Sequence, residues 1–341
     1  MRKYLLASSL LFILIFGNGF GQTRLPNERR DNISFSPPAK ELVRRAGRQV
    51  VVTNIEKLPV GNSEEWNAPI FSPDGKKIYF TNTSYNGIWE YSFESKQTRL
   101  ITSDQGSGYG FAVSQDGNQI AYRRTSYPKG NFERIQEILS LNLKTNKVTS
   151  FAKGDNLSTP TFTKSGVTFS DCDQTKNLSP KISSKEISIL GIENTKIALN
   201  KNGTKFLLDP FSGGSYIWPN LSPDKTKIVA YEADRGTFIC DLNGNILSKL
   251  GKRNAAVWSR DGNWLIYMDD KDDGHNILSS EIMAVSSDGK HTVSLTNTSN
   301  IAEMNPSVSP IENKIVCNSL NGEIFVIYYE DRSATNKKEV K

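Results

Sequence analysis

One unit recurs six times between residues 66 and 330: an apolar strand, a short turn, and a second strand of alternating residues. The copies are PIFSPDGKKIYF (69–80), FAVSQDGNQIAY (111–122), PTFTKSGVTFS (160–170), PNLSPDKTKIVAY (219–231), AVWSRDGNWLIY (256–267) and PSVSPIENKIVC (306–317). The spacing averages about 44 residues, which is the length of a four-stranded propeller blade. A single such sheet cannot bury both of its faces, so the repeat predicts blades stacked around a common axis.

The turn inside each unit explains why the chain reverses there. Pro73 and Pro223 hold the second turn position at a fixed φ, and Gly75, Gly117 and Gly262 can adopt the left-handed conformation. This chemistry predicts a β-hairpin with a bulged three-residue loop. A second strand–turn–strand pattern follows each of the first five units, which completes a sheet of four strands.

The expected fold is an all-β, six-bladed propeller over residues 48–330. The sixth unit supplies only three strands, whereas RQVVVTNIEKL (48–58) precedes the first blade and has no blade of its own. Pairing 48–58 into the last blade would close the ring and cover both sheet edges. An unrelated small domain beginning at 48–58 is the alternative. The expected blades are 66–105, 108–155, 158–212, 215–252, 254–298, and 302–330 together with 48–58.

Three segments of the chain resemble the WD-like repeat of the TolB-like propeller family. They are Ser72-Pro73-Asp74-Gly75, Ser280-Glu281-Ile282-Met283 and Ser287-Asp288-Gly289. The resemblance covers all six units and implies the fold, whereas this repeat occurs in binding proteins and in enzymes alike. The third unit departs from it, because it lacks the Pro-Asp-Gly turn and carries a long insert. We also expect no counterpart of the N-terminal domain that accompanies the TolB propeller.

The first residues have the order of a secretory signal peptide. Arg2 and Lys3 precede an apolar run, and small residues follow it, which predicts a signal peptide over residues 1–21. A retained membrane anchor is the alternative, but the apolar run is short for a span. A polar, basic lead-in (22–47) and a polar tail (331–341) flank the propeller. We therefore expect a periplasmic or secreted protein with no membrane span after signal removal.

Charge and cysteine content exclude two classes of function. The net charge of +6 is small and dispersed, so no nucleic acid partner is expected. The three cysteines, Cys172, Cys240 and Cys317, are far apart, and their odd number indicates no disulfide framework. Cys240 and Cys317 lie in apolar runs, so buried free thiols are expected.

The stretch YMDDKDDGHNIL (267–278) concentrates carboxylates and a histidine. It joins the second and third strands of the fifth unit and is therefore interpreted as a loop. It does not fit an EF-hand, because Lys271 occupies the third position and Ser280 the twelfth. A looser calcium site at Asp270, Asp272 and Asp273, a solvated acidic loop, and a binding loop all stay open. No other cofactor is expected.

We expect the loops that join strand two to strand three, and one blade to the next, to form a binding face. Aromatic and arginine side chains anchor protein interfaces. The candidates are Tyr109, Arg124, Tyr216, Trp218, Arg235, Arg253, Asp270, Asp272, Asp273, His275 and Glu303. Tyr216 and Trp218 could instead pack between blades, which is the favoured interpretation for Trp218.

The expected function is that of a monomeric, non-enzymatic scaffold that binds a protein of the cell envelope. Catalysis is disfavoured because the chain has no Gly-x-Ser-x-Gly motif and only two histidines, His275 and His291, expected on opposite faces. The alternatives are an enzyme acting on a carbohydrate or glycan, and binding of calcium or a small ligand in the propeller channel. A glycosidase needs two facing carboxylates. The chain has many acidic residues, and the sequence alone does not single out such a pair.

Overall fold

The computed structural model describes residues 50–131, 133–163, 166–169 and 187–332, and every regular element in these ranges is a β-strand. The predicted signal peptide, the lead-in segment, Cys172 and most of the tail lie outside the described residues. In the part of the chain that the structure describes, no helix has the length and apolar character needed to span a bilayer.

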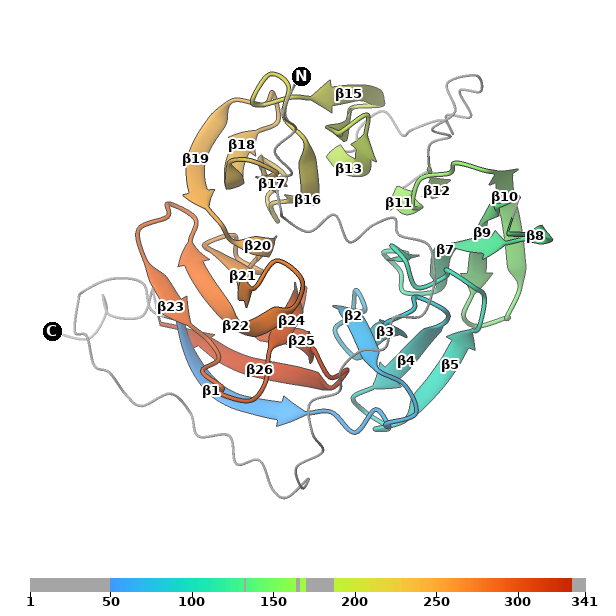
Figure 1. Ribbon diagram of the computed structural model, residues 1–341, viewed down its shortest axis with the longest axis horizontal. Helices are drawn as coiled ribbons and strands as arrows, with labels where there is room; N and C mark the ends of the chain where they lie inside the picture. Colours follow the sequence, from blue (N-terminus) through green and yellow to red (C-terminus); the bar gives the residue numbers. More distant parts are fainter. Residues whose placement is uncertain (1–49, 132, 164–165, 170–186, 333–341) are drawn as a thin grey trace, which may run out of the picture.

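The strands form antiparallel sheets set around one centre, which confirms the predicted six-bladed propeller (Figure 1). Blade 1 contains β2 (Trp66–Phe71), β3 (Lys77–Asn82), β4 (Ile88–Ser92) and β5 (Thr98–Thr102). Blade 2 contains β6 (Ala112–Val113), β7 (Gln119–Ser126), β9 (Ile135–Asn142) and β10 (Val148–Gly154), with the short β8 (Pro128–Asn131) between β7 and β9 in sequence. Blade 4 contains β16 (Tyr216–Leu221), β17 (Lys227–Glu232), β18 (Gly236–Asp241) and β19 (Ile246–Gly251). Blade 5 contains β20 (Asn254–Trp258), β21 (Trp264–Asp272), β22 (Ile277–Ser286) and β23 (Thr292–Ser294).

Blade 6 is closed by the strand that precedes blade 1, as the sequence predicts. Its sheet has the order β1-β26-β25-β24, with β1 (Val50–Lys57), β24 (Glu303–Val308), β25 (Lys314–Ser319) and β26 (Ile324–Asp331). The pairing of β1 with β26 runs from Val50 opposite Asp331 to Lys57 opposite Phe325. This pairing covers the outer edge of β26, which would otherwise offer unpaired backbone groups to another chain.

Blade 3 is divided, and here the prediction needs a correction. β11 (Thr161–Thr163) pairs with β12 (Gly166–Thr168), while β13 (Ile187–Glu193), β14 (Lys196–Lys201) and β15 (Thr204–Leu208) form a separate sheet. The sequence predicts the β14–β15 hairpin but assigns residues 187–193 to an insert. In the structure these residues pair with β14, and Ile187, Ile189 and Ile192 pack on the apolar cluster that β14 and β15 share with blade 4.

The turns of the repeat are fixed by a serine as well as by the predicted Asp and Gly. Ser72 Oγ donates to Asp74 Oδ1 at 2.6 Å, and the Gly75 N–H donates to the Ser72 carbonyl at 2.9 Å. The same pair of side chains recurs as Ser222 with Asp224 at 2.6 Å and as Ser259 with Asp261 at 2.7 Å. In each turn the carboxylate accepts the serine hydroxyl, and a residue with positive φ closes the turn: Gly75 and Gly262 in two of them, and Lys225 in blade 4.

The apolar core lies between neighbouring blades. Between blades 5 and 6, for example, Trp264, Ile266 and Ile282 pack with Ile315 and Phe325, and all five are buried. Complete burial of one such side chain contributes about 1.5–3 kcal/mol. Stacking of the blades is therefore what makes each sheet stable.

The innermost strand carries the same bulge in four blades. Ala68, Trp218, Ala255 and Asn305 have φ values of 48°, 52°, 50° and 51°, and the strand register shifts at each of them. A left-handed conformation costs a non-glycine residue about 1–2 kcal/mol. Since the bulge recurs at equivalent positions, it belongs to the blade design, and it sets how these four side chains leave the inner strand.

Candidate binding face

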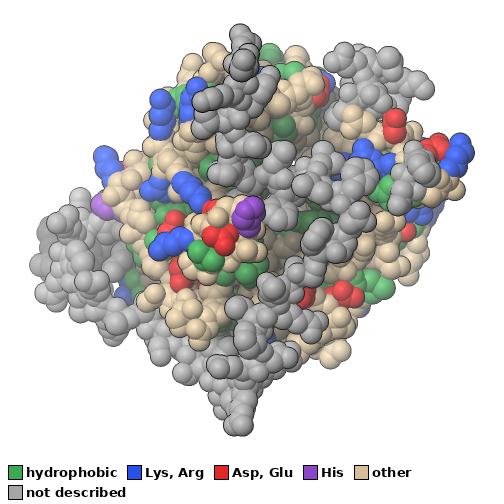
Figure 2. All heavy atoms as spheres, viewed as in Figure 1, with side chains coloured by type: hydrophobic (Ala, Val, Ile, Leu, Met, Phe, Trp, Pro, Cys, Tyr) green, Lys and Arg blue, Asp and Glu red, His purple; other side chains and the backbone are tan. Residues whose placement is uncertain are grey.

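The antiparallel order of the strands gives the ring two faces. The first carries the connections between strands two and three and between successive blades, and we call it the loop face. The opposite one carries the Ser-x-Asp turns, and we call it the turn face. Figure 2 shows acidic and basic side chains next to each other, with a histidine, over β21 and β22.

The acidic stretch is mostly strand, which corrects its interpretation as a loop. β21 continues to Asp272 and β22 begins at Ile277, so only residues 273–276 form the turn. Asp269 pairs with Glu281 and Asp270 with Ser280 in the ladder between these strands. Side chains alternate along a strand, so Asp269 is exposed whereas Asp270 is only 4% exposed.

Asp270 has polar partners in the inner strand β20 and in the connection that precedes it. Asn254 Nδ2 donates to its Oδ1 at 2.6 Å, and Lys252 Nζ lies 3.5 Å from its Oδ2. Burial lowers the pKa of Lys252, but the attraction of Asp270 and Asp272 outweighs it, and the net effect raises the pKa. A buried carboxylate with a cation beside it is a structural ion pair, because the lysine offsets part of the desolvation cost.

Asp272 and Asp273 stabilise the turn and point to separate partners. Asp272 Oδ2 lies 3.4 Å from Lys252 Nζ, and its Oδ1 accepts the Gly274 N–H. Asp273 accepts the N–H groups of Asn276 and His275, which lower the pKa of its carboxyl. In the described ranges no group of three or more His, Cys, Asp or Glu side chains is placed to share a metal ion.

Glu303 opens β24 and is buried at 2% exposure, so it is not the surface side chain that the sequence predicts. Thr298 donates to its Oε1 at 2.9 Å, and its Oε2 has no hydrogen-bond partner. Burial raises the pKa of Glu303 to about 7, and the nearby Glu281 adds to the increase. The site is a carboxylate held in a largely desolvated position between blades 5 and 6.

Blade 4 separates its two candidate aromatic residues. Tyr216 is buried, and its hydroxyl donates to Asp209 and accepts from the Phe211 N–H, so it belongs to the core and not to the binding face. Trp218, two residues later, keeps 37% of its surface exposed. Its ring meets Tyr231 edge to face, with centroids 5.7 Å apart.

The arginine of blade 4 is tied to its own loop. Arg235 is exposed, pairs with Glu232 at 3.1 Å, and lies over the Phe211 ring at 5.1 Å. Burial raises the pKa of Tyr231, while Lys252 lowers it and Asp270 raises it further. Through Tyr231, the exposed Trp218 of blade 4 therefore adjoins the charged pair of blade 5.

Arg253 lies beside that pair, where blade 4 connects to blade 5. Its guanidinium lies over the Tyr267 ring at 5.4 Å, and its main-chain carbonyl accepts the Thr237 hydroxyl. The Nε atom of Arg253 is buried without a hydrogen-bond partner. Arg253 is thus packed flat against blade 5.

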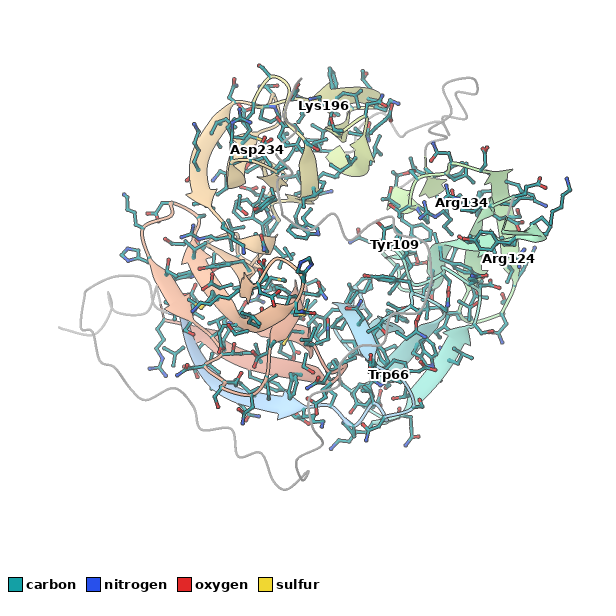
Figure 3. All side chains as sticks on the ribbon, viewed as in Figure 1. Trp66, Tyr109, Arg124, Arg134, Lys196 and Asp234 are labelled. Atoms are coloured by element: carbon teal, nitrogen blue, oxygen red, sulfur yellow. The ribbon has the colours of Figure 1, made fainter. Side chains whose placement is uncertain are left out.

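Tyr109 and Arg124 form a second, separate group. Arg123 lies over the Tyr109 ring at 5.4 Å, and Tyr85 meets the same ring edge to face. Arg124 pairs with Glu137 at 2.6 Å and with Asp104 at 3.7 Å. Figure 3 shows Tyr109 on the side of blade 2 that faces the ring centre and Arg124 farther out. The candidates therefore fall into groups on different blades.

Sequence reasoning missed three exposed apolar residues on the loop face of blades 4, 5 and 6. Ile217 is 36% exposed, Leu278 67% and Leu320 47%. Ile217 precedes Trp218 in β16, Leu278 follows the acidic turn, and Leu320 begins the turn between β25 and β26. The sequence signal for these three residues is an apolar residue next to a turn. Many residues of this chain share that signal, so it does not distinguish these three.

Comparisons with known proteins concern the fold. No protein-family model matches the sequence, and no curated protein matches it either. Among solved structures the chain is similar to TolB from Acinetobacter baumannii, with 20% identity and a TM-score of 0.49, over 72% of this chain and 57% of TolB. It is also similar to an oligogalacturonate lyase from Vibrio parahaemolyticus, with 12% identity and a TM-score of 0.47, over 79% of each chain. A third match is an oligogalacturonate lyase in complex with manganese, with 14% identity and a TM-score of 0.47, over 80% of this chain and 79% of the lyase. The chain thus spans little more than half the length of TolB.

Proposed function

We propose that this protein is an exported, non-enzymatic scaffold that binds a protein partner through the loop face of blades 4 to 6. The observation that carries the proposal is Trp218, a large aromatic residue that is 37% exposed at a left-handed backbone position. Three other blades place Ala or Asn at the equivalent position. Trp is enriched among the residues that dominate interface energies.

Three further exposed apolar residues lie on the same face. Ile217, Leu278 and Leu320 lie on the same face of three consecutive blades, and each keeps more than a third of its surface exposed. Exposed apolar surface that becomes contiguous marks interaction sites on soluble proteins, and we propose that these residues contribute to one such site with Trp218. Lys252, Asp272 and Asp273 supply charges of both signs beside them, which would fix the orientation of a partner.

The N-terminal sequence supports export, since residues 1–21 have the order of a signal peptide. A partner in the cell envelope follows from that location. The protein would act by holding the partner, with no chemical step.

The experiment is quantitative co-purification from the cell envelope with three forms of the mature protein. We expect Trp218→Ala combined with Leu278→Ser to lower recovery of the partner at least tenfold. The matched control is Leu247→Ser, because Leu247 is 54% exposed but lies on β19 at the rim of blade 4. Equal recovery with all three forms would contradict the proposal.

An enzyme acting on a glycan is the second candidate, and Glu303 is the observation that favours it. A carboxyl group with a pKa of about 7 suits a proton donor at neutral pH. Its 2% exposure argues against contact with a polymer. Cleavage of envelope glycans by the wild type, lost in Glu303→Gln, would favour the enzyme over the scaffold.

A further inference from the structure

A concave site lies on the turn face, on the opposite side of the ring from the proposed partner surface. A cavity of about 300 Å³ opens where the inner strands of blades 4, 5 and 6 run into their Ser-x-Asp turns. Asn220, Val257 and Ser307 occupy equivalent positions of the repeat and line it together. The volume is at the lower end of the range for small-molecule sites.

The cavity wall combines apolar residues with polar hydrogen-bonding ones and has no acidic residue. None of its lining residues is Asp or Glu. Asn220 accepts two hydrogen bonds from Trp258, through its side-chain and main-chain oxygens, which leaves its amide nitrogen available as a donor. The Ser307 hydroxyl makes no hydrogen bond to another described residue.

Arg260 supplies a positive charge at the rim. It stands where blades 4 and 6 have Pro223 and Pro310, so blade 5 has replaced the turn proline by a cation. Its guanidinium crosses to blade 6 and donates to the Ile311 carbonyl at 3.0 Å and to Asn313 Oδ1 at 3.3 Å. These two bonds tie the side chain of Arg260, which lines the cavity, to blade 6.

The guanidinium of Arg260 forms no salt bridge with a residue that the structure describes. No carboxylate of the described residues lies within 4 Å of its nitrogens, whereas the adjacent Asp261 is engaged by Ser259 and Asn263. A guanidinium carries five donors, and the two bonds to blade 6 use only part of them. The remaining donors suit the oxygens of an anion.

We propose that this cavity binds a small organic anion, a carboxylate or phosphate compound, with Arg260 pairing its charge and Ser307 and Asn220 donating to its oxygens. Charge-assisted hydrogen bonds from arginine to carboxylate or phosphate are about twice as strong as neutral ones. The site is on the turn face, so it is independent of partner binding on the loop face.

The test is calorimetric titration of the mature protein with citrate, with inorganic phosphate, and with the neutral polyol sorbitol. We expect saturable binding of at least one anion and none of sorbitol, and the anion that binds more tightly identifies the class. In parallel, the indole N–H resonance of Trp258, which lines the cavity, should shift on saturation. Absence of saturable binding by both anions, or equal binding of sorbitol, would overturn the proposal.

Two variants of one residue separate charge from shape. Ser307→Asp places a carboxylate in the wall and should weaken anion binding at least tenfold, while Ser307→Asn, of similar size and neutral, should retain it within threefold. Neither variant changes Ile311 or Asn313, the blade 6 residues that accept from the Arg260 guanidinium. Unchanged binding by Ser307→Asp, or equal loss in both variants, would show that the anion does not occupy this cavity.

Discussion

The side-chain amide of Asn305 in blade 6 donates to Oδ1 of Asn67 in blade 1 at 3.0 Å, across 238 residues of sequence. The same amide donates to Asn318 at 3.1 Å, and Asn318 accepts the Ala68 N–H at 3.2 Å. These contacts join the last inner strand to the first. The ring is therefore closed at its inner strands as well as at the rim, where β1 pairs with β26.

Asn67→Ala should destabilise the ring, because it removes the acceptor of both the Asn305 amide and the Ala68 N–H. We expect a loss of about 1–2 kcal/mol in the free energy of unfolding. Urea unfolding followed by tryptophan fluorescence measures it. Asn297→Ala, at an exposed position, is the control and should leave the midpoint unchanged; a similar midpoint for both variants would contradict the closing role of Asn67.

Glu303 should make stability depend on pH in the neutral range. Its pKa is about 7 in the native state against 4.5 as the ordinary value, so the native state binds this proton more tightly than the unfolded chain does. Stability from this group is therefore complete below about pH 4.5 and is lost as the pH rises towards and through 7. Glu303→Gln should remove this loss and be more stable than the wild type at pH 8, by about 1–3 kcal/mol.

Urea midpoints of the wild type and Glu303→Gln at pH 5 and pH 8 test this sign. The exposed Glu330→Gln is the control and should follow the wild type at both values. A Gln variant that loses stability between pH 5 and pH 8 as steeply as the wild type would refute the assignment to Glu303.

The thiols of Cys240 and Cys317 should be unreactive in the native protein and unpaired. Both are fully buried and free, and burial raises the pKa of Cys240 to about 12 and that of Cys317 well above its usual value. A thiol reagent should therefore label neither in the folded state. After denaturation without reductant, the mature protein should show three titratable thiols; a count of one would reveal a disulfide.

The repeat predicts the fold because its signal is local. Ser72, Asp74 and Gly75 form their turn almost entirely from neighbours in sequence, and the same residues recur in later blades. Closure by 48–58 was predictable because the last sheet lacked a strand. Strand β13 was not, since ISILGIE follows no repeat turn and its partner surface belongs to blade 4.

The candidate site was less predictable because its side chains depend on distant partners. A run of carboxylates is typical of a loop, but Asp270 is stabilised in a strand by Asn254 and Lys252, which precede it by 16 and 18 residues. Similarly, nothing in the sequence around Glu303 indicates that Thr298 and Glu281 enclose it. The alternation of side chains along β21 predicts that Asp269 is exposed and Asp270 buried. That prediction can be made only once the strand is known to continue to Asp272.

The acidic stretch should respond differently at its buried and exposed positions. Asp270→Asn should destabilise the fold by about 1–3 kcal/mol, because it removes the buried charge that pairs with Lys252 and weakens the charge-assisted hydrogen bond from Asn254. Asp272→Asn combined with Asp273→Asn should leave folding nearly intact, since both side chains are exposed. Urea unfolding of the two variants compares these effects.

If the loop face binds a partner with basic groups, the Asp272→Asn, Asp273→Asn double variant should weaken capture and make the residual binding less sensitive to salt, because screened attraction between charges is what it removes. Co-purification at low and high salt measures this. Added calcium should not change the thermal stability of the wild type, because Lys252 already pairs with Asp270 and Asp272, and Asp273 accepts backbone N–H groups of its own turn. A stabilisation by calcium that the double variant loses would instead assign the stretch to a cation, since a ligand that binds only the native state raises its melting temperature.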